Sequence, residues 1–327
     1  GHIWKFVTLA YIPPTIAGVV LAYRKKYLLG GVITALFIAL QIQSNHIQMS
    51  YYFMFVILFF IIAYFVDAYE KKELPHFFKA SAILALAAVV GVCVNISNLY
   101  HTYEYSKETM RGKSELKQEG PAANQTSSGL DRDYITNWSY GIGETLTLLV
   151  PNVKGGGCST TLSQNETAMA KANPMYGNLY SQLTPYFGDQ PWTAGPVYVG
   201  AFVVFLFILG CFIVKGPLKW ALLGATIFSI LLSWGKNFMG LTDFFIDYIP
   251  MYNKFRAVSS ILVIAEFTIP LLAIFALKEI LSKPDILKLK ENRTGVIVTL
   301  VLTAGVALIL AAVSYTHLRA HETLSDL

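Results

Sequence analysis

Long apolar runs separated by short polar connections make up most of this chain. A helix that crosses a membrane needs about 20 mainly apolar residues, and eight runs approach that length. They cover residues 6–23, 27–43, 47–67, 77–99, 196–214, 218–234, 257–277 and 294–313. We therefore expect an all-α polytopic membrane protein with about eight transmembrane helices.

The basic residues of the short connections predict how the chain is oriented. Short cytoplasmic loops and the neighbouring span ends carry an excess of Lys and Arg. The connections on one side hold Arg24, Lys25, Lys26, Lys71, Lys72, Lys79, Lys215, Lys219, Lys278, Lys283, Lys288, Lys290 and Arg293. We assign that side to the cytoplasm, so a long loop at 100–195 is expected outside.

The same pattern predicts the division of the chain. Residues 1–99 and 196–313 should each form a membrane bundle of four spans, and residues 100–195 an extracytoplasmic cap that is either α/β or irregular. The segment 314–327, with "SYTHLRAHET", resembles a translated sequencing adapter, so we expect a non-native tail. Because "GHIWKF" carries neither an initiator Met nor a signal peptide, we expect an internal fragment.

Composition agrees with a membrane protein and narrows the partners. The 327 residues are 54% hydrophobic and 14% charged, whereas soluble proteins carry about 25% charged residues. The net charge of +5 therefore reflects topology rather than nucleic-acid binding. Of the three cysteines only Cys158 lies in a polar stretch, which excludes a disulfide framework.

Polar residues gather where the second, third and fourth spans reach the predicted outer side. Asn45, His46 and Gln48 lie in "LQIQSNHIQMSYYF", and Asn98 and His101 share one helix face in "NISNLYHTYEYSKE". Such groups either cap helix ends or line a wet cavity in the membrane. Both alternatives stay open at this point.

Two charged segments are candidates for chemistry. Asp131 and Asp133 flank Arg132 in "GLDRDY", which is either a solvated turn or a carboxylate pair that acts as a base or holds a divalent metal such as Mg or Mn. Lys254 and Arg256 follow the aromatic stretch "LTDFFIDYIPMY". They either bind a lipid phosphate or anchor the chain at the interface.

Glu266 stands in the middle of the apolar run "ILVIAEFTIP". An ionisable group at that depth costs at least ~2.5 kcal/mol unless it faces a cavity or a partner. The sequence therefore predicts either a functional role or a structural pair near Pro270, whose ring leaves a carbonyl without its helical partner.

Several blocks in order, including "SNHIQMSYYF", "SSGLDRDYITNWSYGIGET" and "MYNKFRAVSSILVIAEFTIPLLA", carry a family resemblance. Over residues 1–313 the chain resembles the YfhO-like membrane proteins of Bacteroidetes, which are similar to GT-C glycosyltransferases. The resemblance implies a multi-pass enzyme of the bacterial cytoplasmic membrane. Such an enzyme takes sugar from a polyprenyl-phosphate-linked donor and modifies an envelope glycan on the outer face.

The resemblance also suggests roles for the candidate residues. The family usually carries its catalytic carboxylate in the first outer loop, which we expect to lie upstream of residue 1. Asp131 and Asp133 are the catalytic candidates that remain. The candidates for substrate binding are Asn45, His46, Gln48, Asn98, His101, Lys254, Arg256 and Glu266.

Two other functions stay open. A transporter or flippase of lipid-linked sugars would use the same polar cavity, and it predicts internal repeats and broken helices. A non-catalytic partner in envelope assembly would leave the charges of the outer face scattered instead of convergent.

Overall fold

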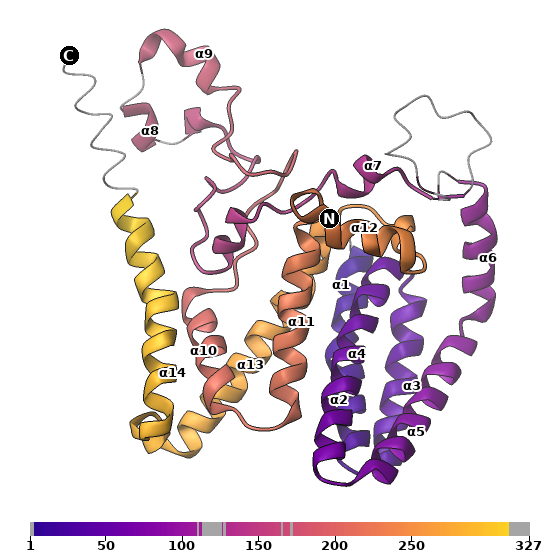
Figure 1. The fold of residues 1–327 in the computed structure, drawn as a ribbon. Helices are drawn as coiled ribbons and strands as arrows, with labels where there is room; N and C mark the ends of the chain where they lie inside the picture. Colours follow the sequence, from indigo (N-terminus) through magenta and orange to yellow (C-terminus); the bar gives the residue numbers. More distant parts are fainter. Residues whose placement is uncertain are drawn as a thin grey trace. The chain divides into compact units, whose positions relative to one another are not determined.

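The structure is a computed structural model that describes residues 3–109, 111–112, 126, 129–164, 166–170 and 173–313 (Figure 1). The tail predicted at 314–327 lies outside the described residues. Contacts divide the chain into two compact units. Unit 1 comprises 1–136, 215–232 and 238–265, and unit 2 comprises 137–214, 233–237 and 266–327. The predicted division into membrane and loop segments follows topology rather than packing, and it stays a prediction.

Helices and short turns build the described residues, which contain no strand. Of the two alternatives predicted for the long loop, its described part therefore fits the irregular one, with short helices and no strand. Unit 1 contains α1 (Ile3–Ala10), α2 (Ile12–Tyr23), α3 (Tyr27–Gln43), α4 (Ile47–Glu70), α5 (Leu74–Cys93), α6 (Ile96–Lys107), α7 (Arg132–Thr136), nearly all of α11 (Pro217–Ser233), α12 (Met239–Tyr248) and the 3-10 turns Tyr252–Lys254 and Val258–Leu262.

Unit 2 combines the second half of the loop with three longer helices. Its elements are the 3-10 turns Gly143–Leu148, Leu162–Gln164, Pro174–Tyr176 and Pro284–Lys288, with α8 (Glu166–Ala170), α9 (Gly177–Tyr180), α10 (Ala201–Ile213), most of α13 (Val263–Ser282) and α14 (Lys290–Leu300), which a π-helical turn at Val301–Gly305 extends. Gly210 of α10 packs against Leu272 and Ala276 of α13, and Gly295 of α14 packs against Phe212.

Several of these helices are long and apolar enough to cross a membrane. Among the described residues they are Ile3–Tyr23, Ile47–Glu70, Leu74–Cys93, Val258–Ser282 and Lys290–Val313, with a sixth if the bent pair Pro217–Ser233 and Gly235–Tyr248 is one span. The all-α, multi-helix character is thus confirmed. Helices α3 and α10 occupy two further predicted spans but have only 17 and 13 residues, so the count of eight stays a prediction.

Backbone chemistry explains where the helices of unit 1 end. The first span is interrupted at Tyr11, and Pro13 and Pro14 stand in the first turn of α2, where their missing N–H groups cost no helical bond. Lys25, Asn45 and Lys72 take left-handed backbone angles after α2, α3 and α4, with φ of 67°, 57° and 59°. This conformation closes a helix end, and Asn adopts it more readily than Lys.

Small residues let α2, α3 and α5 approach closely (Figure 1). A Cβ on Gly18 would lie 2.5 Å from Thr34 Oγ1, and a Cβ on Gly30 would lie 2.5 Å from the backbone nitrogen of Ala22. Gly91 of α5 meets α3 in the same way. Close backbone approach through small residues is typical of helices that pack in a membrane.

Candidate functional site

A polar cluster in unit 1 joins segments that are far apart in the sequence. We name it the Arg256 cluster, and its residues are Gln48, Arg132, Tyr134, Asp243, Asp247, Lys254 and Arg256. Gln48, in the first turn of α4, donates from Nε2 to the Arg256 carbonyl at 2.8 Å and to the Tyr52 hydroxyl at 2.9 Å. Arg256 donates from Nη1 to the Tyr134 hydroxyl at 2.7 Å, and its guanidinium lies 5.5 Å from that ring's centroid. Arg256 therefore links α4 to α7.

Arg132 connects α7 to α12. Its Nε lies 3.1 Å from Asp243 Oδ1 and its Nη2 lies 2.5 Å from Asp247 Oδ1. The two aspartates stand four residues apart, on one face of α12. Burial opposes the charge on Arg132, but the two carboxylates raise its pKa overall. Both carboxylates of α12 are thus engaged with a permanent cation.

The segment between α12 and α13 holds Lys254 and Arg256 in a strained conformation. Met251 and Ala257, on either side, have left-handed φ angles of 68° and 58°. Such a conformation costs about 1–3 kcal/mol per residue and persists only where surrounding contacts impose it. Arg111 and Lys254 supply such contacts, because each donates from its side chain to the other's carbonyl, at 3.0 and 2.7 Å.

The surroundings of Lys254 also change its chemistry. Burial lowers the pKa of Lys254, because its ammonium loses contact with water. The long flexible side chain keeps its ammonium on the Arg111 carbonyl. Strain and partial desolvation together mark the segment 251–257 as a candidate site rather than a simple connection.

The catalytic candidates lie beside this cluster. Asp131 and Asp133 are exposed and stand on either side of Arg132, at the start of α7. The Asp131 carbonyl accepts the Ile135 backbone N–H at 2.9 Å, so Asp131 also begins the helix. The structure therefore brings Asp131, Asp133, Gln48, Lys254 and Arg256 onto neighbouring elements of unit 1.

The remaining candidates of unit 1 have other surroundings. Asn45 forms the left-handed turn after α3, and His46 is the N-cap residue of α4. The buried Ser44 beside them bonds to Thr8 of α1 at 2.5 Å. Asn98 and His101 are exposed on α6, and within the described residues no hydrogen bond or ion pair joins either of them to the Arg256 cluster.

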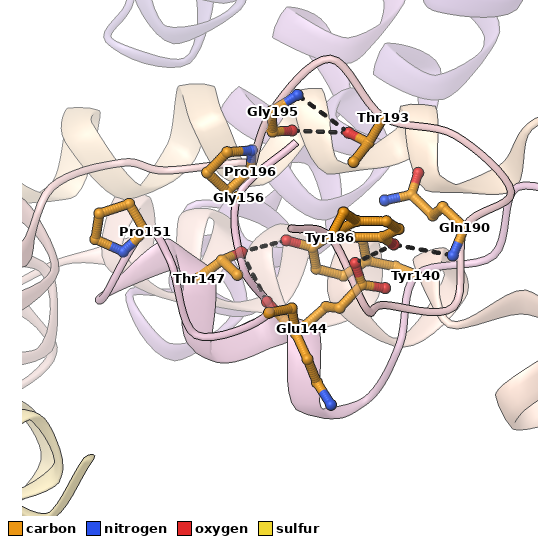
Figure 2. Close-up of a pocket in the computed structure, with 11 residues that line it drawn as sticks. Tyr140, Glu144, Thr147, Pro151, Gly156, Tyr186, Gln190, Thr193, Gly195 and Pro196 are labelled. Atoms are coloured by element: carbon orange, nitrogen blue, oxygen red, sulfur yellow. Dashed lines mark hydrogen bonds between the residues drawn. The ribbon is translucent and has the colours of Figure 1, made fainter. Parts of the chain in front are cut away.

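Unit 2 contains a second cluster, built on the buried carboxylate of Glu144. Glu144 is 2% exposed, and its Oε1 accepts the Tyr186 hydroxyl at 2.6 Å. Its Oε2 accepts the backbone N–H of Gly141 at 2.6 Å and that of Asp189 at 3.3 Å. Figure 2 shows Glu144 and Tyr186 facing each other, with the Tyr186 hydroxyl also accepting from Gln190 N at 2.9 Å. These donors compensate for the loss of water around the carboxylate.

The Glu144 cluster continues to Asp189 and the segment 236–237. Asp189 Oδ2 accepts from Asn237 Nδ2 at 3.1 Å, and its carbonyl accepts from Lys236 Nζ at 3.2 Å. A Cβ on Gly141 would lie 2.6 Å from Asp189 Oδ2 and 3.0 Å from Glu144 Oε2, so glycine lets both carboxylates reach the backbone. A Cβ on Gly188 would likewise collide with Glu144 Oε1 and the Tyr186 hydroxyl.

Two tyrosines of this cluster have raised pKa values. Burial raises the pKa of Tyr140 to about 12, and the charges of Glu144 and Glu266 add to the effect. Burial and then the hydrogen bond to Glu144 raise the pKa of Tyr186. Glu266 is exposed on α13, and its charge is one of the smaller causes of the raised pKa of Tyr140. Both phenols therefore stay neutral near pH 7.

A small cavity adjoins this cluster. Its lining residues are Tyr140, Glu144, Thr147, Pro151, Lys154, Gly156, Tyr186, Gln190, Thr193, Gly195 and Pro196 (Figure 2). The free volume is about 10 Å³, which is close to the room that one water needs. The cavity suits a water or a single hydroxyl group rather than a whole sugar.

Glu144, Asp189 and Tyr134 are not among the site residues that the sequence predicts. A signal for Glu144 does exist, since "SYGIGETLTLLVP" places one carboxylate among apolar residues and directly after the short Gly-Ile-Gly segment. Asp189 follows a glycine in "FGDQPW" in a similar way. Tyr134 adjoins Asp133 in the quoted "GLDRDY" block and offers a phenol beside the charges.

Within the described ranges, no group of three or more His, Cys, Asp or Glu side chains is arranged to hold a metal ion. Comparisons with protein-family models, with curated proteins and with solved structures found no match.

Proposed function

We propose that the protein is a membrane glycosyltransferase that moves a sugar from a polyprenyl-phosphate donor to an envelope glycan, on the outer face of the bacterial cytoplasmic membrane. One observation carries the proposal. The hydrogen bond from Arg256 to Tyr134 joins a basic segment to α7, the helix that begins with Asp131 and Asp133. Moving a sugar from a lipid phosphate to an acceptor hydroxyl requires a carboxylate that takes the hydroxyl proton and cations that stabilise the leaving phosphate. Adjoining elements of unit 1 carry both kinds of group.

The proposed step is a displacement at the anomeric carbon. Asp131 or Asp133, as carboxylate, takes the proton from an acceptor hydroxyl. The freed oxygen forms a bond to the anomeric carbon, and the bond from that carbon to the phosphate oxygen breaks with its electron pair. The charge that develops on the departing lipid phosphate is stabilised by Lys254 and Arg256.

Other predicted residues take supporting roles. Gln48 holds the Arg256 carbonyl, so it orients the segment rather than taking part in chemistry. Asp243 and Asp247 hold Arg132. A divalent metal, Mg or Mn, stays a separate prediction, and no step of the mechanism depends on one.

Single substitutions test the proposal in membrane vesicles supplied with radiolabelled polyprenyl-phosphate sugar and an envelope glycan fraction. Arg256→Ala should lower the transfer rate by about 10²- to 10³-fold, because it removes a preorganised donor to the leaving group. Replacing the active one of Asp131 and Asp133 by Asn should lower it by about 10²- to 10⁴-fold.

Matched controls come from exposed charges elsewhere in the chain. Asp285→Asn and Arg293→Ala remove the same charges at exposed positions, and both should leave transfer within about twofold. Transfer that survives the paired change of Asp131 and Asp133 to Asn would contradict the base assignment. Unaltered protein that transfers no more sugar than empty vesicles would contradict the whole proposal.

A transporter of lipid-linked sugars is the second candidate, and the bent pair of helices favours it. The helical segments Pro217–Ser233 and Gly235–Tyr248 meet at 107°, and transporters place broken helices at their substrate sites. This alternative predicts that labelled donor crosses the bilayer with its sugar–phosphate bond intact, and that the Asp131 and Asp133 variants move it at the normal rate.

A further inference from the structure

The short connection between α11 and α12 is held by the long loop of unit 2. Tyr140 N donates to the Ser233 carbonyl at 2.8 Å, and Trp234 Nε1 donates to Thr145 Oγ1 at 2.9 Å. Lys236 N donates to Ser139 Oγ at 2.9 Å. Backbone and side-chain groups of residues 139–145 thus bond to the connection along its length.

A second segment of the loop, at Asp189, forms hydrogen bonds to the same connection. Asn237 Nδ2 donates to Asp189 Oδ2 at 3.1 Å and to the Tyr140 carbonyl at 3.0 Å. Lys236 Nζ donates to the Asp189 carbonyl at 3.2 Å. Asn237 therefore bridges the two loop segments.

Glu144 ties the two loop segments to each other. Its carboxylate accepts from Gly141 on one segment and from Tyr186 and Asp189 on the other. Because Glu144 is buried, these bonds are shielded from water, and charge-assisted bonds in such surroundings are about twice as strong as neutral ones. Removing the Glu144 carboxylate would remove the hydrogen bond that holds the Asp189 backbone. The bond between Asp189 and Asn237 would then be less well held in place.

We propose that Glu144, Tyr186, Asp189 and Asn237 form a clasp that sets the bend between α11 and α12. Within this connection Gly235 takes a positive φ of 45°, and the two helical segments on either side of it meet at 107°. A connection without tertiary bonds would leave this angle variable. When the hydrogen bonds of the clasp break, the angle between α11 and α12 is no longer fixed and takes a range of values. Glu144 therefore controls this angle.

The clasp is independent of the proposed transfer, so its test uses no substrate. Cysteines at the exposed positions Ile227 and Tyr248, in a chain whose native Cys93, Cys158 and Cys211 are replaced by Ser, allow spin labels on the two helices. Pulsed electron resonance in lipid nanodiscs then measures the distance between the labels. Unaltered protein should give one narrow distribution.

Glu144→Gln and Tyr186→Phe should each broaden that distribution. Hydrogen exchange of the amides at 233–237 should become about tenfold faster, while the amides of α4 keep their rates. Glu166→Gln is the matched control, since Glu166 is an exposed carboxyl of the same loop, and it should change neither measurement.

Tyr186→Phe keeps the ring and removes only the hydroxyl, so it separates the clasp from general misfolding. A folded Tyr186→Phe protein with the parent distribution, and with unchanged exchange at 233–237, would overturn the proposal. So would equal broadening in the Glu166→Gln control.

Discussion

Arg132 lies between two carboxylates of α12 that are both partly open to water. The side chains of Asp243 and Asp247 are 42% and 44% exposed, so water screens both ion pairs. A double-mutant cycle with Arg132→Gln and Asp247→Asn should therefore give a coupling free energy of at most about 1 kcal/mol, measured by unfolding in detergent. A coupling above about 3 kcal/mol would mean that this pair is effectively buried.

Tyr186 offers a residue-level test at alkaline pH. Its folded pKa is raised by burial and by Glu144, above an unfolded value of about 10. The neutral phenol therefore contributes stability below about pH 10, and this contribution is lost as the pH rises towards the folded pKa. Comparing the tyrosinate absorbance of the parent and of Tyr186→Phe should reveal one phenol that ionises above its ordinary range.

The same titration identifies the cause of the shift. Glu144→Gln removes the negative charge but keeps an acceptor, so Tyr186 should ionise at a lower pH in that variant than in the parent. An identical titration of Tyr186 in both proteins would show that Glu144 does not raise its pKa.

The sequence predicts where a single side chain lies only when its neighbours along the chain determine that position. The i,i+4 spacing of Asp243 and Asp247 follows from helix geometry alone. The burial of Glu144 does not, because it depends on Tyr186 and Asp189, more than 40 positions further along the chain. The hydrogen bond from Gln48 to the Arg256 carbonyl likewise joins residues that are far apart in the sequence.

At the scale of elements, α2 and α3 depend on close contact through glycine. Gly30→Ala would place a Cβ 2.5 Å from the backbone nitrogen of Ala22, and backbone has little room to move. We expect a loss of about 1–3 kcal/mol in the free energy of unfolding, measured by denaturant titration in detergent.

Gly240→Ala is the matched control for that substitution. Gly240 lies in α12, and a Cβ there meets nothing within 4 Å. Because Ala favours a helix more than Gly does, this change should stabilise by up to about 1 kcal/mol. Equal effects of the two substitutions would contradict the packing account.

The apolar pattern predicts the helices better than it predicts their ends. Every predicted span contains a helix, since a long apolar run has few alternatives in a membrane. The 107° bend after Ser233 escapes prediction, because Trp234, Lys236 and Asn237 bind partners from the distant loop. The short helices of that loop lack periodicity, so no sequence rule locates them.

For the whole molecule, charge distribution predicts the orientation in the membrane. Cys158 lies in the long loop, which the positive-inside rule assigns to the outer side, and it is partly exposed. A membrane-impermeant maleimide should label Cys158 on intact spheroplasts when Cys93 and Cys211 are replaced by Ser. A cysteine at the basic connection, Lys283→Cys, should react only after the membrane is opened, and the reverse pattern would contradict the assignment.

In the proposed function, a sugar leaves its lipid phosphate at the Arg256 cluster. Purified protein in liposomes that contain polyprenyl-phosphate sugar and a glycan acceptor tests it directly, with free polyprenyl phosphate and glycosylated acceptor counted together. We expect one polyprenyl phosphate to be released for each sugar transferred, and both products to be lost in Arg256→Ala. Donor that crosses the bilayer intact, with no polyprenyl phosphate released, would contradict it.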